Sequence, residues 1–544
     1  MSKRLRPGRG GYLKTRFSVK SLLALLLLAV WVLPSLGCTR SVIKPRDLTA
    51  TAEIKRLTPQ FLTQPSLNSS GTGSGQAAVI FSTPSEAGRT EQDEPIISAT
   101  PTQISTPKPP MLYYTQAGDT LTALAVRFEV DPEEILAPDG MPETPVLPPN
   151  HLLIIPDVLS ETGPGDSVMP DSEIIFSPSA VDFDIKAFVN DAGGYLSTYR
   201  EWMSTGWNSG AEVVQRVAIE NSINPRLLLS ILEYQSHWVY GQPGTLAQSD
   251  YPIGWANFSD RGLYQQLSWA VQQLSIGYYG WRAGLLTEMD FPKDANGVIM
   301  RLSPRLNAGT AALQYLYARL YNQREWGGAL YAAESLPALH EKMFGNPWLR
   351  AQSVEPLYPP NLLQPDLQLP FGYGRTWSLT GGPHSAWGPD GALAALDFAP
   401  SSEASGCIES TDWITASAPG KVIRSGNGIV VLDLDGDGFE QTGWALLYLH
   451  VATKNRVGAG SWVEADEHLG HPSCEGGAAT GTHVHFARKY NGEWILADGP
   501  IPFVVSGWRA RAGEKIYEGT LEKNGKVVTA CPCSSADTLV TREK

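Results

Sequence analysis

The sequence predicts a multidomain fold with a small strand–helix–strand unit, a mostly α-helical middle domain and a strand-rich C-terminal domain. The chain has 544 residues, which is too many for one hydrophobic core, because domains typically hold about 100 to 200 residues. Polar stretches that contain proline divide it into segments. The spacing of apolar residues is helical in the middle segment and alternates near the C-terminus. We therefore expect three folded units joined by linkers.

The charge balance limits the partners that the chain can have. Its formal net charge is -13 and its isoelectric point is near 5.3. Binding to phosphate backbones needs a dense basic face, and the segments expected to fold contain no such cluster. We therefore expect no nucleic-acid partner.

Residues 1–38 have the features of a signal peptide. Basic residues occur throughout the first twenty positions without one acidic residue. The apolar run that follows, from Leu22 to Leu33, would rise only ~18 Å as a helix, whereas the hydrocarbon core of a bilayer is ~30 Å thick. A cleavable signal is therefore favoured over a permanent membrane span.

The apolar run ends at Pro34-Ser35-Leu36-Gly37-Cys38, which resembles the lipobox of bacterial lipoproteins. The resemblance implies that Cys38 receives the lipid and becomes the new N-terminus. The protein would then be held in the cell envelope by a lipid anchor in the membrane. Plain secretion and an uncleaved anchor are the alternatives.

Three polar segments are interpreted as connections between the folded units. Residues 39–110 are rich in Ser, Thr, Pro and Gln and have few aromatic residues, so they cannot bury enough apolar surface to offset their chain entropy. We expect them to form a disordered tether. Residues 158–180 and 351–368 are shorter, contain proline and are expected to be linkers.

The first folded unit is expected over residues 111–157. A short strand, a turn at Gly118, a helix start and a closing strand at 152–155 follow one another there. This pattern resembles a LysM module. The resemblance implies a β-α-α-β fold that binds N-acetylglucosamine-containing glycans through the segments Gly118–Leu121 and Leu147–His151. A small adhesion fold without sugar binding is the alternative.

The middle domain is expected to be helical over residues 181–350. Its segment Asn224–Ser236 resembles the catalytic helix of lysozyme-like lytic transglycosylases. Gln235 stands where that family has its acidic Glu, and a carboxamide cannot protonate a glycosidic oxygen. Glu233 lies two positions away and would point to another helix face. We therefore expect a degenerate lysozyme-like domain that binds glycan or acts only as a spacer.

The strongest chemical signal is a concentration of histidines in residues 369–511, which hold six of the nine in the chain. In the motif His483-Val484-His485, apolar neighbours indicate a strand, and its period of two places both imidazoles on one face. His384 follows a glycine-rich turn. Asp397 lies in the middle of a short apolar strand, and a buried acid needs a partner such as a metal. His450 ends another strand.

These residues resemble the lysostaphin-like zinc endopeptidases, in particular the β-lytic protease and staphylolysin branch. The shared features are a Gly-Gly-x-His turn, an Asp thirteen residues later, a Tyr-x-His strand and a His-x-His strand, in that order. The resemblance implies an antiparallel β-sheet metallopeptidase domain over 369–511. It implies that His384, Asp397 and His485 bind one zinc ion and that His450 and His483 act in catalysis. Residues 512–544 would form a C-terminal extension.

The expected function is hydrolysis of peptide bonds in peptidoglycan, with the LysM module holding the enzyme on the glycan. Three protein ligands leave one zinc position open for water, whose pKa falls toward about 7. Either catalytic histidine is suited to move a proton near neutral pH. A non-catalytic wall-binding lipoprotein is the alternative, as is a glycan-cleaving enzyme that uses the middle domain.

Two further groups of residues are weighed. Four cysteines remain after Cys38, and an oxidising compartment permits disulfides between them. One of three pairings joins Cys407 to Cys474 and Cys531 to Cys533, although the last two are close together. The acids of the second group lie in a loop that resembles the start of a calcium-binding loop. They are Asp433, Asp435 and Asp437. Trp444 stands where such a loop needs its last acid, so a glycine-rich hairpin is favoured.

Overall fold

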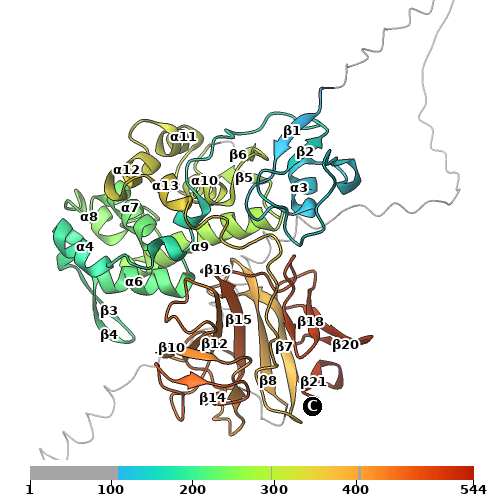
Figure 1. Ribbon diagram of the computed structural model, residues 1–544. Coiled ribbons are helices and arrows are strands. Elements are labelled where there is room, and N and C mark those ends of the chain that lie inside the picture. Colours follow the sequence, from blue (N-terminus) through green and yellow to red (C-terminus); the bar gives the residue numbers. More distant parts are fainter. Residues whose placement is uncertain (1–107, 296, 402–405, 544) are drawn as a thin grey trace, which may run out of the picture. The chain divides into compact units, whose positions relative to one another are not determined.

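The computed structural model describes residues 108–295, 297–401 and 406–543, which form a helical part and a part made mainly of strands (Figure 1). The predicted signal peptide, Cys38 and nearly all of the predicted tether lie outside the described residues. No helix in the described ranges is long and apolar enough to cross a membrane. The predictions for the N-terminal segment therefore remain predictions.

The first unit has a strand, a helix, a single 3₁₀ turn and a second strand. These are β1 (Met111–Tyr114), α3 (Leu121–Phe128), η3 (Pro132–Glu134) and β2 (Leu152–Ile155). The two strands pair antiparallel, and α3 begins where the Thr120 side chain accepts a hydrogen bond from the Ala123 N–H. The second helix of the expected β-α-α-β order is thus only one 3₁₀ turn. The first unit has a small hydrophobic core of its own, which contains Phe128 and Leu153.

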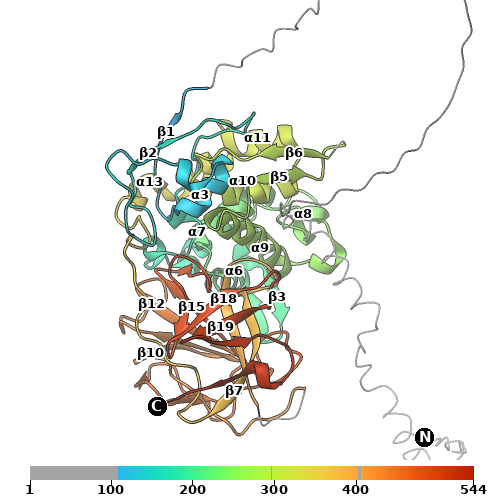
Figure 2. The ribbon, with the colours of Figure 1, turned by 90° about the vertical axis from the view of Figure 1, so that its right-hand side faces the viewer.

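The middle part is mostly helical and also contains two β-hairpins. Its helices are α4 (Ile185–Ala192), α5 (Tyr195–Thr198), α6 (Gly210–Asn221), α7 (Pro225–Ser236), α8 (Leu246–Asp250), α9 (Leu263–Arg282), α10 (Ala308–Leu320), α11 (Gln323–Tyr331), α12 (Leu336–Phe344) and α13 (Pro347–Ala351). The 3₁₀ turns are η4 (Asp171–Glu173), η5 (Pro178–Ala180) and η6 (Phe258–Asp260). The hairpins are β3 (Arg200–Met203) with β4 (Gly206–Ser209) and β5 (Glu288–Phe291) with β6 (Val298–Arg301). Helix α9 packs beside α10 (Figure 2).

The C-terminal part is built on a nine-stranded sheet. Eight of its strands follow the order β13-β10-β11-β12-β15-β8-β7-β21, and β16 pairs with β15. These strands are β7 (Thr376–Ser385), β8 (Leu393–Pro400), β10 (Gly420–Gly426), β11 (Ile429–Asp433), β12 (Trp444–Leu449), β13 (Trp462–Val463), β15 (Val484–Tyr490), β16 (Glu493–Trp494) and β21 (Leu539–Thr541). All of the strand pairs in this sheet are antiparallel.

Two smaller sheets cover one face of the large sheet and enclose a core with it. The first contains β9 (Ile414–Thr415) and β14 (His468–Gly470). The second contains β17 (Val504–Val505), β18 (Trp508–Ala512), β19 (Gly519–Lys523) and β20 (Lys526–Thr529), and the turn η7 (Ala536–Thr538) follows it. The core between the sheets contains Leu396, Phe398 and Phe486.

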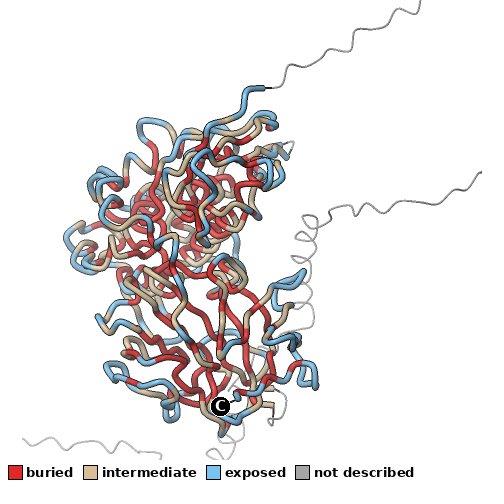
Figure 3. Tube along the Cα trace, turned by 45° about the vertical axis from the view of Figure 1, so that its right-hand side comes forward, coloured by how far each residue is buried: buried red, intermediate tan, exposed pale blue. Residues whose placement is uncertain are grey.

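The opposite face of the large sheet packs against the helical part. Ala395, Leu447 and Ala487 alternate with the residues of the first core and belong to the same buried cluster as Tyr278 and Tyr279 of α9. Buried residues are accordingly present in both parts (Figure 3). The helical part and the strand part therefore share one hydrophobic core.

The segments expected to be linkers are packed into this shared core. Ile174 and Ile175 of segment 158–180 are fully buried, and so is Leu357 of segment 351–368, at 1% exposed. Their polar and proline-rich neighbours suggested free connections, but each segment also carries the apolar residues that fill the junction. The C-terminal extension expected at 512–544 is also part of the fold, because β21 pairs with β7 at the edge of the large sheet.

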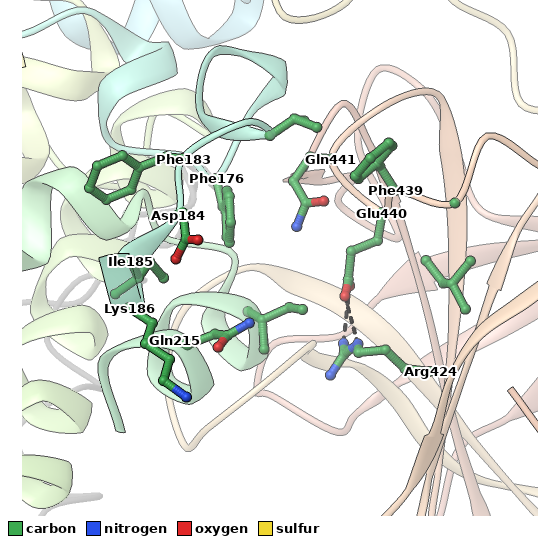
Figure 4. Close-up of a pocket in the computed structure, with 14 residues that line it drawn as sticks. Phe176, Phe183, Asp184, Ile185, Lys186, Gln215, Arg424, Phe439, Glu440 and Gln441 are labelled. Atoms are coloured by element: carbon green, nitrogen blue, oxygen red, sulfur yellow. Dashed lines mark hydrogen bonds and ion pairs between the residues drawn. The ribbon is translucent and has the colours of Figure 1, made fainter. Parts of the chain in front are cut away.

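A buried carboxylate stabilises the loop between β11 and β12. Glu440 accepts a hydrogen bond of 3.0 Å from Arg424 and pairs with Lys489, and both Glu440 and Lys489 are only 2% exposed. Burial alone would raise the pKa of Glu440, but Arg424 and Lys489 hold it below its usual value. Figure 4 shows the Glu440–Arg424 pair beside a cavity of about 380 Å³, which has Phe183 and Ile185 on its other side.

We predict that Glu440→Gln lowers the free energy of unfolding by about 3 to 5 kcal/mol, because it leaves the buried Lys489 ammonium without its counter-ion. Since the pKa of Glu440 is lowered on folding, its contribution is present above the unfolded value near 4.5 and is lost as the pH falls through the folded value. Urea denaturation at pH 7 measures the loss. Glu409→Gln is the control, because Glu409 pairs with an exposed Lys454, and it should leave the midpoint unchanged. Equal midpoints for the two variants would contradict this role of Glu440.

Candidate metal centre

Three neighbouring strands bring His384, Asp397 and His485 together. In the sheet register, Asp397 of β8 lies opposite His485 of β15 and opposite Gly381 of β7. Because side chains alternate along a strand, the Asp397 and His485 side chains point to the same face as Ala395 and Ala487. One ligand atom from each of the three residues lies within 4.8 Å of the other two. The structure thus brings together the three residues that the family resemblance implied as metal ligands.

The glycine-rich segment before His384 is part of a strand and not the predicted turn. Strand β7 runs through it, with shifts of register on both sides of Gly381. A Cβ atom on Gly381 would lie 2.7 Å from Asp397 Oδ2, and one on Gly382 would lie 2.5 Å from the carbonyl oxygen of Glu518. The two glycines therefore allow close approach on both sides of a bulged strand.

Backbone carbonyls fix the tautomers of both histidines in the cluster. His384 Nδ1 is 2.8 Å from the carbonyl oxygen of Gly382, and His485 Nε2 is 3.0 Å from that of Ala386. A carbonyl only accepts hydrogen bonds, so these two ring nitrogens carry the protons. The neutral rings then direct the lone pairs of His384 Nε2 and His485 Nδ1 toward each other, 3.0 Å apart. Such outer hydrogen bonds are typical of metal-binding histidines.

The carboxylate of Asp397 completes a cluster of electron-pair donors. Its Oδ1 atom is buried, accepts no hydrogen bond and lies 3.2 Å from both His384 Nε2 and His485 Nδ1. Burial would raise the pKa of Asp397, but His384 and His485 hold it well below its usual value. Burial would lower the pKa of His384, but Asp397 in turn raises it, so this point attracts positive charge, either a proton or a metal cation. Two imidazoles and one carboxylate are a ligand set that zinc prefers.

His450 and His483 lie beside this cluster with their ring centroids 4.4 Å apart. The Nδ1 atom of His450 donates to the carbonyl oxygen of Glu475, and that of His483 donates to the carbonyl oxygen of Gly481, each over 2.8 Å. In each ring Nε2 is the nitrogen that does not face a carbonyl, and that of His483 lies 3.8 Å from Asp397 Oδ1. Burial, together with the nearby His483, lowers the pKa of His450 to about 4. His450 is thus unprotonated near neutral pH.

The ring of Tyr517 stacks on that of His384, with the ring centroids 4.2 Å apart. No sequence motif indicated this residue. Backbone hydrogen bonds hold it there, because its carbonyl oxygen accepts from the Gly382 N–H and its own N–H donates to Pro383. Tyr517 lies in the segment that was expected to be an extension, 32 positions after the His-x-His strand. Neither periodicity nor motif spacing connects it with that strand.

Two disulfides are present among the described residues. Cys407 is bonded to Cys474 with an S–S distance of 2.06 Å, and Cys531 is bonded to Cys533. The first bridge joins two loops, one of which provides the Glu475 carbonyl that orients His450. His468 and His471 pack on Trp413, and neither belongs to the cluster of His384, Asp397 and His485.

The acidic loop after β11 is a second cluster of carboxylates. Asp433, Asp435 and Asp437 have oxygens within 4.8 Å of one another. Asp433 accepts hydrogen bonds from the N–H groups of Gly436 and Gly438, and burial raises its pKa to about 6. The segment connects β11 directly to its antiparallel partner β12, as expected for the hairpin. Calcium binding there stays a prediction.

Glu233 and Gln235 of helix α7, the residues compared above with the catalytic acid of lytic transglycosylases, both have hydrogen-bond partners. Glu233 accepts hydrogen bonds of 2.9 Å from the N–H groups of Val239 and Tyr240 and so orders the loop after the helix. Gln235 accepts a hydrogen bond of 2.8 Å from the Tyr321 hydroxyl. The lysozyme-like interpretation of this part stays a prediction.

Comparison with known proteins finds relatives for both large parts of the chain. Residues 167–360 match the family model described as LasA, N-terminal domain. Protease LasA of Pseudomonas aeruginosa strain UCBPP-PA14 is 28% identical over 301 residues, which is 51% of this chain and 65% of the relative. The match therefore spans just under two thirds of that protein's length.

Other relatives match the strand part. Beta-lytic metalloendopeptidase of Lysobacter enzymogenes is 27% identical over 167 residues, which is 29% of this chain and 90% of the relative. A solved structure described as a novel M23 metalloprotease, pseudoalterin, from the deep sea has 26% identity and a TM-score of 0.27, and covers 31% of this chain and 96% of its own. The chain is thus similar to the LasA N-terminal domain over residues 167–360 and, at 27 to 28% identity, to protease LasA and to a beta-lytic metalloendopeptidase.

Proposed function

We propose that the protein is a zinc-dependent endopeptidase that hydrolyses peptide bonds of peptidoglycan. The observation that supports this most strongly is the convergence of one possible ligand atom from each of His384, Asp397 and His485 within 4.8 Å. The relatives named protease and metalloendopeptidase support the same class of reaction. One zinc ion per chain would be held by these three ligands.

The neighbouring histidines would move the protons of the reaction. Bound zinc supplies a Lewis acid that polarises a carbonyl and acidifies water. His450 and His483 each direct Nδ1 to a backbone carbonyl, so Nε2 is the nitrogen that each would use. One Nε2 would accept a proton from the attacking water and the leaving amine would then receive it. The Tyr517 ring, stacked on His384, would keep that imidazole in its orientation.

The first unit would hold the enzyme on its substrate. Its strand–helix–strand order supports the LysM interpretation, in which N-acetylglucosamine-containing glycan binds beside Gly118–Leu121 and Leu147–His151. Tethering a catalytic site to a wall that cannot diffuse raises its effective concentration at the bonds to be cut. A lipid on Cys38 would keep the protein outside the cytoplasm, in the cell envelope.

We expect His485→Ala and Asp397→Ala to abolish both zinc binding and hydrolysis, because each removes a ligand. His483→Ala should keep most of the zinc and lower kcat at least a hundredfold, because general base catalysis contributes about 10² to 10⁴ in rate. Metal analysis of each purified variant, followed by a count of new amino termini released from peptidoglycan, separates the two effects. Full turnover by either ligand variant would rule out the ligand assignment.

Gly381→Ala should weaken zinc binding about 10 to 100-fold, because its Cβ would displace Asp397 and such changes around a ligand have effects of that size. Competition with a chromogenic chelator measures the affinity. Gly372→Ala is the matched control, since a Cβ there meets nothing within 4 Å. Equal affinities for the two variants would show that Gly381 does not position the ligand.

The direct test of the proposed function uses the full chain and isolated peptidoglycan. Zinc per chain is measured first, and release of amino termini is then followed with and without a chelator. One zinc per chain with chelator-sensitive release is the expected result. New reducing sugar ends without new amino termini would instead indicate a glycan-cleaving enzyme.

A further inference from the structure

The first unit contacts the rest of the chain through the loop between β1 and α3. Gln116 Nε2 donates to the carbonyl oxygen of Arg305 over 2.5 Å, and Arg282 Nη1 donates to the carbonyl oxygen of Ala117. The guanidinium lies so close to Gly118 that a Cβ there would be 1.2 Å from Nη1. This loop is therefore covered by the C-terminal end of α9 and by the segment before α10.

One face of helix α3 continues the same contact. Arg127 donates to the carbonyl oxygen of Trp281 over 2.8 Å, and its guanidinium carbon lies 4.3 Å from the centroid of the Trp281 ring. At the end of α9, a Cβ on Gly284 would lie 3.0 Å from Ala123 Cα and 3.4 Å from Ala123 Cβ. The loop and the helix thus dock as one surface, in which the backbones approach closely.

This docked surface includes one of the two segments expected to bind glycan. Asp119 and Leu147, from the two segments, are joined by a backbone hydrogen bond of 2.8 Å, so the segments lie side by side. The space that remains next to Gly118 and Thr120 is a cavity of about 30 Å³, closed on its other sides by residues such as Arg282 and Trp494. That volume holds one or two water molecules, and a sugar ring does not fit.

We propose that this surface of the first unit has two alternative partners, the chain's own helix α9 and an N-acetylglucosamine glycan. Docking and glycan capture then exclude each other, so a glycan chain binds only the undocked unit. This inference rests on the proposed glycan binding of the first unit, and it adds helix α9 as a competitor for the same surface. Glycan affinity is reduced by the fraction of molecules that are docked.

When the first unit undocks, the buried arginines on both sides keep a carboxylate partner, so the docked state can be reversible. Arg282 keeps its contact of 2.9 Å with Asp171, its ion pair of 3.4 Å with Glu493 and its hydrogen bond with Tyr278 when the first unit moves away. Arg127 likewise keeps its ion pair of 2.8 Å with Asp119 inside the first unit. The contacts that are lost are hydrogen bonds to carbonyls, apolar contacts, the contact of Arg127 with the Trp281 ring and the ion pair between Glu129 and Arg301. The Glu129 side chain is already 55% exposed, and Arg301 keeps the carboxylate of Glu288 at 4.0 Å. The exposed segment Ser160–Glu161 can serve as the hinge.

A disulfide across the contact tests the inference in the full chain. In Ala123→Cys with Gly284→Cys the two Cβ atoms would be 3.4 Å apart, close to the ~3.5–4.5 Å of natural disulfides. Binding of a soluble N-acetylglucosamine hexamer is measured by calorimetry before and after mild reduction, with the wild type under the same conditions as control. We expect the reduced form to bind at least tenfold more tightly than the oxidised form, and the wild type to be unaffected.

A single substitution just after α9 tests the opposite direction without changing the first unit. Gly284→Asn adds a carboxamide beyond the Cβ, which itself has Ala123 Cα at 3.0 Å and Ala123 Cβ at 3.4 Å. This larger side chain should undock the unit and raise hexamer affinity above that of the wild type. Gly193→Asn is the matched control, because Gly193 also has a positive φ, of 68°, but a Cβ there meets nothing within 4 Å. It should bind like the wild type.

The outcomes separate this inference from the proposed function. Equal hexamer affinity in the oxidised and reduced double variant would overturn the competition and leave glycan binding intact. No binding by any variant, including Gly284→Asn, would overturn glycan binding by this unit and the competition with it. Release of amino termini from peptidoglycan is measured on the same samples. This second measurement tests the proposed peptidase activity independently of glycan binding.

Discussion

The register of strand β8 between β7 and β15 is the constraint on which the site depends. Because side chains alternate along a strand, a slip of one residue would turn Asp397 into the core that Leu396 and Phe398 fill. The same register places His485 next to Leu449 of β12, so that His450 follows at the edge of the cluster. The bulged glycines of β7 then let His384 reach the carboxylate.

The face of the sheet that carries the ligands is also the face that packs on helix α9. Ala395 and Ala487 lie two residues from Asp397 and His485 and are buried against the helical part. The loop after His384 reaches α9 as well, where Gln272 donates to Asp390 over 2.9 Å. The helical part therefore sets part of the surroundings of the cluster.

The meeting of His384, Asp397 and His485 could be predicted from sequence because each of them lies in a recognisable motif. Those motifs report local backbone geometry, and the sheet joins them through register. What could not be predicted depends on contacts between distant segments. The glycines of β7 looked like a turn because a bulge and a turn use the same residue. Tyr517 and β21 looked like an extension, since nothing near them in sequence indicates the strand they meet. The linkers looked free because their polar residues outnumber the few apolar ones that are buried.

The shared core of the helical and strand parts has a consequence for how such proteins can diverge. Units joined by free linkers can be exchanged between proteins with little cost. Here Tyr278 donates to Glu493 and the Tyr279 hydroxyl accepts from the Trp494 N–H, so each half fits only a partner with the matching surface. The helical part and the strand part are thus expected to be inherited as a pair, whereas the first unit has a core of its own and can be gained or lost separately.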